Sequence, residues 1–574
     1  MKKGERIEGF QIKSIDVLPK LKNTMIQLEH EKTGAKMIHL SNEDDNNGFA
    51  VAFRTTPVDS TGVAHILEHT ALCGSRRYPV RDPFFSMIKR SMKTFMNAFT
   101  ASDWTMYPFA TQNETDYFNL LNVYLDAALF PLLSEESFKQ EGHRLEFEEQ
   151  EDPNSPLTIQ GIVYSEMKGA MSSQSQIMHR SMGNALFPTV TYRHNSGGDP
   201  ECIADLTHKQ LLDFHRFYYH PSNAYFYTYG DIDLEKRLQV INVSLTEFDK
   251  IDIDTIVPDE KRFTSPQSFR YQYPLNQAEN DGEKCQIALG WLTCSIQDPV
   301  EILSLQVINL ILLGHSGAPL RKKLLESKLG KSLADTTGFE DEIKEAYFSV
   351  GLQAVAEKNI PQVEKLIFET LQEIVDAGIE PEQVNSAIHQ MELDTREISG
   401  GHYPYSLNLL FRFFGTWMHG GDPLNSIDFD NILRQLKTRI EEENYLESQI
   451  KKYLIDNPHR VKVILVPDTE LEGKKLSAVR ASLEKIKSFL SDSEKEKLLL
   501  DSKALRTAQE TKEDLSCLPS LKLADIPRGI KHVDPHGKTM ADLDIKFYDR
   551  PTNGILYFNW HFKIGISNTL ISIR

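Results

Sequence analysis

The sequence predicts an α+β protein built from repeated α/β domains, each an antiparallel-rich sheet covered by helices, followed by a helical hairpin. Three observations carry this prediction. Short apolar runs precede a helical pattern near the N-terminus, the same order returns in the middle of the chain, and a charged helix-forming stretch follows.

Length and composition indicate a multidomain globular protein. The chain has 574 residues, more than one hydrophobic core usually serves, with 40% hydrophobic and 25% charged residues. The mostly apolar stretch Ile308–Leu313 falls far short of the ~20 residues of a membrane helix. The net charge of −18 disfavours nucleic acid and would attract basic substrates if the acids line a cavity. We therefore expect neither a membrane nor a nucleic-acid partner.

The N-terminus and the cysteines favour a reducing compartment. Residues Met1–Arg6 are mostly charged, and neither an apolar leader core nor an arginine-rich transit segment follows them. The five cysteines are scattered and lack CxxC spacing, so neither disulfides nor a thiolate metal site is expected. These features predict a cytoplasmic protein.

The first structural unit is predicted from strands followed by a helix. Met25–Leu28, Ala35–Leu40 and Phe49–Phe53 have strand patterns and would form an antiparallel meander. A helical pattern then covers Val63–Leu72, and Gly74 is suited to cap its C-terminus.

A second unit repeats this order. Gln286–Trp291 has the pattern of a strand and Val300–Leu313 that of a helix, followed by Gly314–Gly317. Aligning the two glycine turns places Gln306, Asn309 and Leu310 where the first unit has His65, Glu68 and His69. We favour an internal duplication in which only the first copy keeps the metal-binding residues, although strand-turn-helix units are common enough to match by accident.

The C-terminal part predicts a helical hairpin and then a new sheet. Residues 469–515 are charged and helix-forming, so they would either link two larger units or form two exposed helices without a connecting role. Beyond them, strands Asp544–Tyr548 and Ile555–Phe558 flank an Asn553-Gly554 turn. A third sheet is thus expected to begin shortly before the chain stops.

The motif His65-Ile66-Leu67-Glu68-His69 lies within the predicted first helix. Residues four apart project from one helical face, so both imidazoles can reach one metal ion, with Glu68 close by. Two ligands and a general base within little more than one turn suit a zinc hydrolase, and HxxEH is the inverzincin signature. The alternative is a chance meeting of polar residues on an exposed helix.

A third ligand has two candidate neighbourhoods. Glu141–Glu149 is dense in acids, which is typical of a solvated surface, whereas in Gly161–Gly169 the single Glu166 stands among apolar residues. A buried carboxylate needs a partner, and a metal ion is one. Spacing favours Glu166 only modestly.

Several further segments extend the pattern over almost the whole chain. They are Leu72-Cys73-Gly74-Ser75, Arg81-Asp82-Pro83-Phe84-Phe85, Asn97-Ala98-Phe99-Thr100-Ala101-Ser102-Asp103 with Thr105 and Tyr107, Gly161–Gly169, Tyr219–Ala224 with Gly230-Asp231, and Ser316–Leu320. Together with the HxxEH motif, they resemble the N-terminal half of the peptidasome branch (subfamily C) of the M16 metallopeptidase family.

The resemblance implies a metal site and a substrate strand. His65, His69 and Glu166 would bind one Zn2+ per chain, Glu68 would be the catalytic base, and Asn97, Ala98, Phe99 and Thr100 would form the edge strand that pairs with a peptide. It also implies a metalloendopeptidase that cleaves short unstructured peptides inside a chamber of two halves joined by a helical hairpin.

The expected domains follow from the resemblance. They are a catalytic M16-type domain at 1–265, a non-catalytic M16-like domain at 266–468, a hairpin linker at 469–525 and the truncated start of a third M16-like domain at 526–574. Because family members run to nearly twice this length, two alternatives stay open. One is a zinc- and peptide-binding chain that is inactive or needs a separate polypeptide for the C-terminal half. The other is a two-chain processing protease with a non-catalytic partner.

Overall fold

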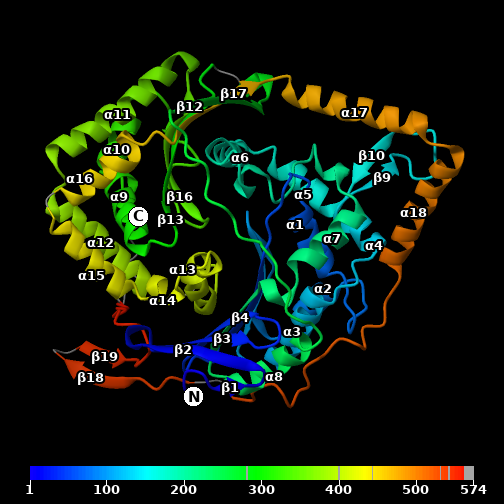
Figure 1. The fold of residues 1–574 in the computed structure, drawn as a ribbon, viewed down its shortest axis with the longest axis horizontal. Coiled ribbons are helices and arrows are strands. Elements are labelled where there is room, and N and C mark those ends of the chain that lie inside the picture. Colours follow the sequence, from blue (N-terminus) through cyan, green and yellow to red (C-terminus); the bar gives the residue numbers. More distant parts are fainter. Residues whose placement is uncertain (280–281, 399–400, 443, 530–531, 541–542, 562–574) are drawn as a thin grey trace, which may run out of the picture.

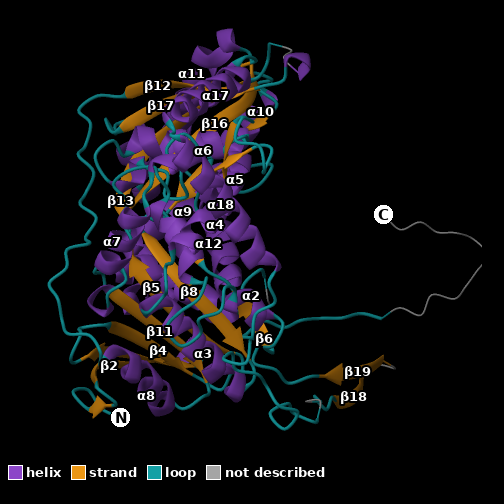
Figure 2. Ribbon diagram, turned by 90° about the vertical axis from the view of Figure 1, so that its right-hand side faces the viewer, coloured by secondary structure: helices purple, strands orange, loops and turns teal. Residues whose placement is uncertain are grey.

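The computed structural model describes residues 1–279, 282–398, 401–442, 444–529, 532–540 and 543–561. Two mixed β-sheets with flanking helices dominate it, and Figure 2 shows the first sheet (β4, β5, β8, β11) below the second (β12, β13, β16, β17). The α+β class predicted from the sequence is confirmed.

The first sheet has the strand order β1-β2-β3-β4-β11-β5-β8-β6, with β7 also paired to β8. Its central strands are buried along their whole length because helices cover both faces. The strands are β1 (Arg6–Ile7), β2 (Phe10–Leu18), β3 (Asn23–His30), β4 (Lys36–Ser41), β5 (Asn47–Arg54), β6 (Lys93–Met96), β7 (Phe99–Thr100), β8 (Trp104–Thr111) and β11 (Ala224–Gly230).

The predicted meander of the first three apolar runs is only partly right. β3 and β4 pair antiparallel, but β11 lies between β4 and β5, parallel to β4 and antiparallel to β5. An apolar run predicts that a strand forms but does not indicate which strand pairs with it. The position of β11, which comes from far along the chain, could therefore not be predicted from local pattern.

Helices of the first unit cover one face of this sheet, where the largest apolar core lies. They are α1 (Val63–Ala71), α2 (Pro83–Ile88), α3 (Glu114–Leu129), α4 (Glu135–Glu141), α5 (Ile162–Ala170), α7 (His208–Tyr218) and α8 (Leu234–Leu245), with a small hairpin of β9 (Arg144–Phe147) and β10 (Leu157–Gln160) beside them. Helix α1 begins one residue after Gly62 and ends one residue earlier than predicted.

The second sheet repeats the core of the first. Its order β12-β17-β13-β16-β14 matches β4-β11-β5-β8-β6 in chain order and in pair direction, including the single parallel pair. The strands are β12 (Gln267–Pro274), β13 (Cys285–Ser295), β14 (Ser332–Leu333), β15 (Gly338–Glu340), β16 (Glu345–Val355) and β17 (Arg460–Asp468). This shared topology supports the predicted internal duplication.

Helices of the second unit form its own core on one face of this sheet. They are α9 (Pro299–Leu313), α10 (Pro319–Glu326), α11 (Ile360–Ala377), α12 (Pro381–Arg396), α15 (Phe429–Ile440) and α16 (Tyr445–Ile450). The short helix α14 (Pro423–Ile427) instead buries Ile427 in the cluster on the first sheet. Among the described residues, no helix combines the length and the apolar character needed to cross a membrane.

The two units exchange one helix each. Helix α13 (Tyr405–Met418) comes from the second unit but packs on the first sheet, where the hydroxyl of Tyr227 donates to the Ser406 carbonyl at 2.8 Å. Helix α6 (Gln174–Leu186) comes from the first unit but packs on the second sheet, where Met178 and Met182 are buried. Figure 1 shows α6 reaching toward β12 and β17 while α13 lies above β2, β3 and β4.

Two long helices follow the second sheet, as the charged stretch predicts. They are α17 (Leu471–Phe489) and α18 (Asp492–Glu510), with Ser491 capping the second. They run along different sides of the molecule in Figure 1, and they pack on β9 and β10 of the first unit through Leu483, Phe147 and Leu157.

The predicted C-terminal hairpin is wrong in its pairing. β19 (Leu543–Phe547) pairs with β18 (His536–Met540), and Ile555–Phe558 is not a strand. The Asn553-Gly554 turn does form, with both residues at positive φ, but a turn alone does not supply the cross-strand contacts that hold a ribbon together. The last part of the expected third domain, 562–574, lies outside the described residues.

Candidate metal centre

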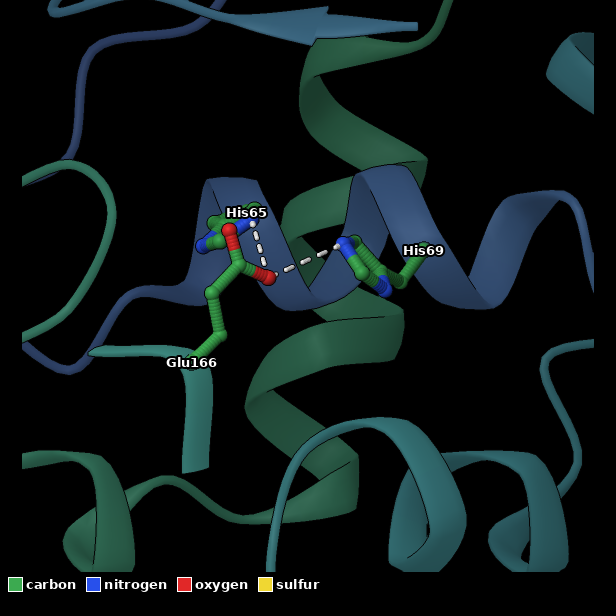
Figure 3. Close-up of side chains that lie close together, drawn as sticks. All are labelled: His65, His69 and Glu166. Atoms are coloured by element: carbon green, nitrogen blue, oxygen red, sulfur yellow. Dashed lines mark ion pairs between the residues drawn. The ribbon is translucent and has the colours of Figure 1, made fainter. Parts of the chain in front are cut away.

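Helix α1 carries the HxxEH motif with its apolar side against the sheet. Ile66 and Leu67 are fully buried in the first core, which turns His65 and His69 toward α5. Glu166 on α5 completes the group: its Oε2 lies 3.9 Å from Nε2 of His65 and 3.9 Å from Nε2 of His69 (Figure 3). The structure thus brings all three predicted ligands together, and all ligand atoms lie within 4.8 Å of one another.

The other ring nitrogen of each histidine has its own partner. Nδ1 of His65 lies 2.9 Å from the Gly197 carbonyl oxygen, and Nδ1 of His69 lies 3.0 Å from Oε2 of Glu141. Such partners leave Nε2 of each ring free and fix its direction, which is how metal-bound histidines are generally held.

These residues fit a zinc ion. Ligands of a tetrahedral zinc lie about 3.3 Å apart for bonds of ~2.0–2.1 Å, so the observed spacing needs only a small closing movement. Glu166 is free to make it, because its side chain is 54% exposed whereas that of His65 is 12% exposed. Two imidazoles and one carboxylate, with one side open, are a donor set of catalytic zinc sites.

Glu141 is a functional candidate that sequence reasoning assigned wrongly. The acid-rich stretch was expected to be a solvated surface, yet the Glu141 side chain is 8% exposed and contacts His69. Burial alone would lower the pKa of His69, but the hydrogen bond with Glu141 and the nearby charge of Glu68 raise it overall. The spacing between Phe138 and Glu141 could have indicated that Glu141 is buried, because residues three apart share a helical face. Both side chains are buried on α4.

Gly197 is the second residue that sequence reasoning missed. The segment around Gly197 can approach the start of α1 because Gly62, which precedes the helix, has no side chain. Gly62 also has a φ of +73°. A Cβ on Gly62 would lie 2.7 Å from Cα of Gly198, so only glycine permits this contact.

Glu68 faces away from the solvent and toward the edge of the first sheet. Its side chain is buried, and the Thr100 hydroxyl donates a hydrogen bond to its Oε2 at 2.6 Å. The predicted base therefore adjoins both the histidine ligands on its own helix and the predicted substrate strand.

The predicted substrate strand lies at the sheet edge. β6 and β7 each pair with β8 on one side only within the described structure, and the Asn97 N–H donates to the Pro108 carbonyl between them. Phe99 packs against Tyr403 and Phe411 of the second unit, and Ala98 packs on the first core. Asn97, Ala98, Phe99 and Thr100 are thus placed beside α1 as an edge.

Three family profiles match consecutive parts of the chain. They are insulinase (peptidase family M16) at residues 54–178, the peptidase M16 inactive domain at 205–391 and the region associated with subfamily C of peptidase family M16 at 465–572.

Curated relatives match nearly the whole chain. Mitochondrial presequence protease of Xenopus laevis is 41% identical over 99% of this chain and 55% of its own length. The proteins of the same name from Mus musculus and Emericella nidulans are 39% and 38% identical over 97% of this chain and 54% of their own length. The chain therefore spans about half the length of these relatives.

Solved structures share the fold. A protease from Helicobacter pylori superposes with a TM-score of 0.59 at 16% identity, covering 76% of this chain and 98% of that one. Pitrilysin superposes with a TM-score of 0.55 at 15% identity, covering 80% of this chain and 47% of its own.

The comparisons correct one expectation. A cytoplasmic location was predicted from the N-terminal composition, but the relatives are mitochondrial by name. The first residues are a poor guide to location, because Arg6–Leu18 already belongs to strands of the first sheet and its composition reflects the fold.

Matches to three successive M16 profiles and long alignments to presequence proteases agree with the duplicated fold. The chain belongs to the M16 peptidase family and is a presequence-protease-like member of its subfamily C.

Proposed function

We propose that this chain is the zinc-binding, catalytic half of a metalloendopeptidase that cleaves short unstructured peptides. The observation that carries the proposal is the convergence of two oriented imidazoles and Glu166 beside a buried glutamate and a sheet edge. The relatives are presequence proteases by name, and presequences are Arg-rich and poor in acids. Such peptides would complement a chain with a net charge of −18.

The residues divide the chemistry among them. An extended peptide would add to the edge at Asn97–Thr100 through backbone hydrogen bonds, so that its shape rather than its sequence is recognised. When bound by His65, His69 and Glu166, zinc would polarise the scissile carbonyl and acidify a water molecule.

Glu68 would move the protons. Its carboxylate takes a proton as the water oxygen bonds to the carbonyl carbon, and it returns that proton to the nitrogen as the C–N bond breaks. The products are a carboxylic acid and an amine, which become a carboxylate and an ammonium group when the remaining proton passes to the nitrogen, and no other reactant is needed.

A second candidate is a chain that binds zinc and peptide but needs a separate C-terminal-half polypeptide for turnover. Large apolar side chains near the C-terminus favour this candidate because each is at least half exposed. They are Leu556, Tyr557, Phe558 and Trp560. A partner of the kind that completes the longer relatives would cover them.

Hydrolysis of a quenched fluorescent peptide tests both candidates. The peptide would have about a dozen residues and a basic sequence, with the zinc-loaded chain compared before and after chelator treatment. Cleavage that chelation abolishes and zinc restores supports the first candidate, and stoichiometric zinc without cleavage supports the second. A chain that binds no zinc would contradict both.

Glu141→Gln is expected to weaken zinc binding by about 10- to 100-fold, because the neutral amide holds His69 less firmly. Competition with a chromophoric chelator measures the affinity. Glu149→Gln is the matched control, since Glu149 is an exposed acid of the same stretch. Equal zinc affinity in the two variants would show that the Glu141 contact is irrelevant to the metal.

Zinc affinity is expected to fall as the pH falls. Glu141 and the neighbouring acids raise the pKa of His69, so its protonated form persists to a higher pH in the metal-free chain. Zinc must displace this proton, which costs about tenfold in apparent affinity per pH unit below that pKa. Titrations between about pH 5 and 8 would reveal the slope. In Glu141→Gln the fall in zinc affinity should begin at a lower pH. A zinc affinity that does not change with pH in the unaltered chain would refute the coupling between zinc binding and loss of the His69 proton.

A further inference from the structure

We propose that Thr100 is a positioning residue for Glu68: its hydroxyl holds the base and ties it to the strand on which the peptide would lie. The inference rests on the proposed function, in which Glu68 is the base. It gives the side chain of Thr100 a role separate from the backbone pairing expected of Asn97–Thr100.

The hydrogen bond between Thr100 and Glu68 is short. The Thr100 hydroxyl donates to Oε2 of Glu68 at 2.6 Å, a distance typical of a hydroxyl bound to an ionised carboxylate. Within the described part of the chain, it is the one hydrogen bond recorded for the Glu68 carboxylate, whose residue is only 9% exposed. A buried carboxylate with a single anchor takes its orientation from that anchor.

The hydrogen bond also distinguishes the two oxygens of the Glu68 carboxylate. Oε2 is engaged by Thr100, which leaves Oε1 to accept the proton of the attacking water. A base that rotates about its side-chain bonds would lose this alignment, and small misplacements of reacting groups can cost large factors in rate.

Thr100 is itself held firmly. It pairs with Thr105 across the β7–β8 ladder, and the Ala101 N–H donates to the Trp104 carbonyl in the turn that follows. Asp103 in this turn is completely buried, and its Oδ2 accepts from the Tyr192 hydroxyl at 2.6 Å. The same oxygen lies 3.0 Å from Nε2 of His419, which is in the second unit.

One rigid element therefore serves two purposes. The backbone of β7 would pair with the peptide while the Thr100 side chain orients the base, so the register of a bound peptide and the position of Glu68 are fixed together. The second unit contributes the close approach of His419 to Asp103 in this turn.

The test compares Thr100→Val with Thr100→Ser in the zinc-loaded chain. Valine keeps the shape and the strand backbone but removes the donor, whereas serine keeps the donor. We expect Thr100→Val to lower kcat by about 10- to 100-fold with KM and zinc content nearly unchanged, and Thr100→Ser to keep most of kcat. Thr94→Val is the matched control, since Thr94 lies on the same edge and donates to Asn46 away from the site.

Two outcomes would overturn the proposal. One is a Thr100→Val variant with the kcat of the unaltered chain; the other is an equal loss in Thr100→Ser, which would indicate methyl packing. Thermal unfolding of each variant identifies a folding defect. Crystal structures of the zinc-loaded chain and of Thr100→Val give a readout without turnover: a Glu68 carboxylate that keeps its position without the hydroxyl refutes the positioning role, even if the unaltered chain cleaves no peptide.

Discussion

Replacing Glu68 with glutamine is expected to lower kcat for peptide hydrolysis by about 10²- to 10⁴-fold while zinc binding persists. The amide is nearly the same size and can still accept the Thr100 hydrogen bond, but it cannot take a proton from water. The three ligand atoms belong to other residues, so the metal site should survive. Single-turnover hydrolysis and zinc stoichiometry on the same sample measure the two effects.

Glu136→Gln provides the control for this substitution. Glu136 is exposed at the start of α4, so its loss should leave both activity and zinc content unchanged. Full activity in Glu68→Gln would remove Glu68 from the proton transfer and with it the proposed mechanism.

His65→Ala is expected to abolish zinc binding and activity together. It removes one of three ligands from a site whose remaining groups, His69 and Glu166, come from two different helices. The loss of affinity should exceed the 10- to 100-fold expected when only an orienting partner such as Glu141 is lost. Equilibrium dialysis against zinc, followed by metal analysis, measures it.

His179→Ala is the comparison for the histidine variant. His179 is an exposed histidine on α6 whose Nδ1 lies 2.9 Å from the Ser175 carbonyl oxygen of its own helix, so its removal should leave zinc binding intact. A His65→Ala chain that retains stoichiometric zinc of undiminished affinity would show that the metal is held elsewhere.

Local features of the fold were predictable from the sequence. The strand-turn-helix units at Phe49–Leu72 and Gln286–Leu313 appear as β5 with α1 and as β13 with α9. The HxxEH motif could be interpreted because its residues are close in sequence and lie within one helix. Helical periodicity then determines that the two histidines project from the same face.

Long-range features were not predictable in the same way. The place of β11 between β4 and β5, and the pairing of β19 with β18, depend on contacts between segments whose patterns say nothing about partners. Glu141 was misassigned because a stretch dense in acids suggests a solvated surface, and it is the tertiary fold that buries Glu141 and Glu146. The choice of Glu166 over its neighbours needed either a family resemblance or the structure, since spacing alone left both regions possible.

The exchange of α6 and α13 makes the two units one cooperative body. Cutting the chain near residue 265 would strip α13 from the first sheet and expose the apolar face formed by residues such as Ile38, Ala50 and Tyr227. The first unit would then be an aggregation-prone fragment rather than a stable domain. The second copy has Gln306, Asn309 and Leu310 at the positions aligned with His65, Glu68 and His69, yet the first unit depends on it structurally. Each copy contributes a helix that covers one apolar face of the other copy's sheet.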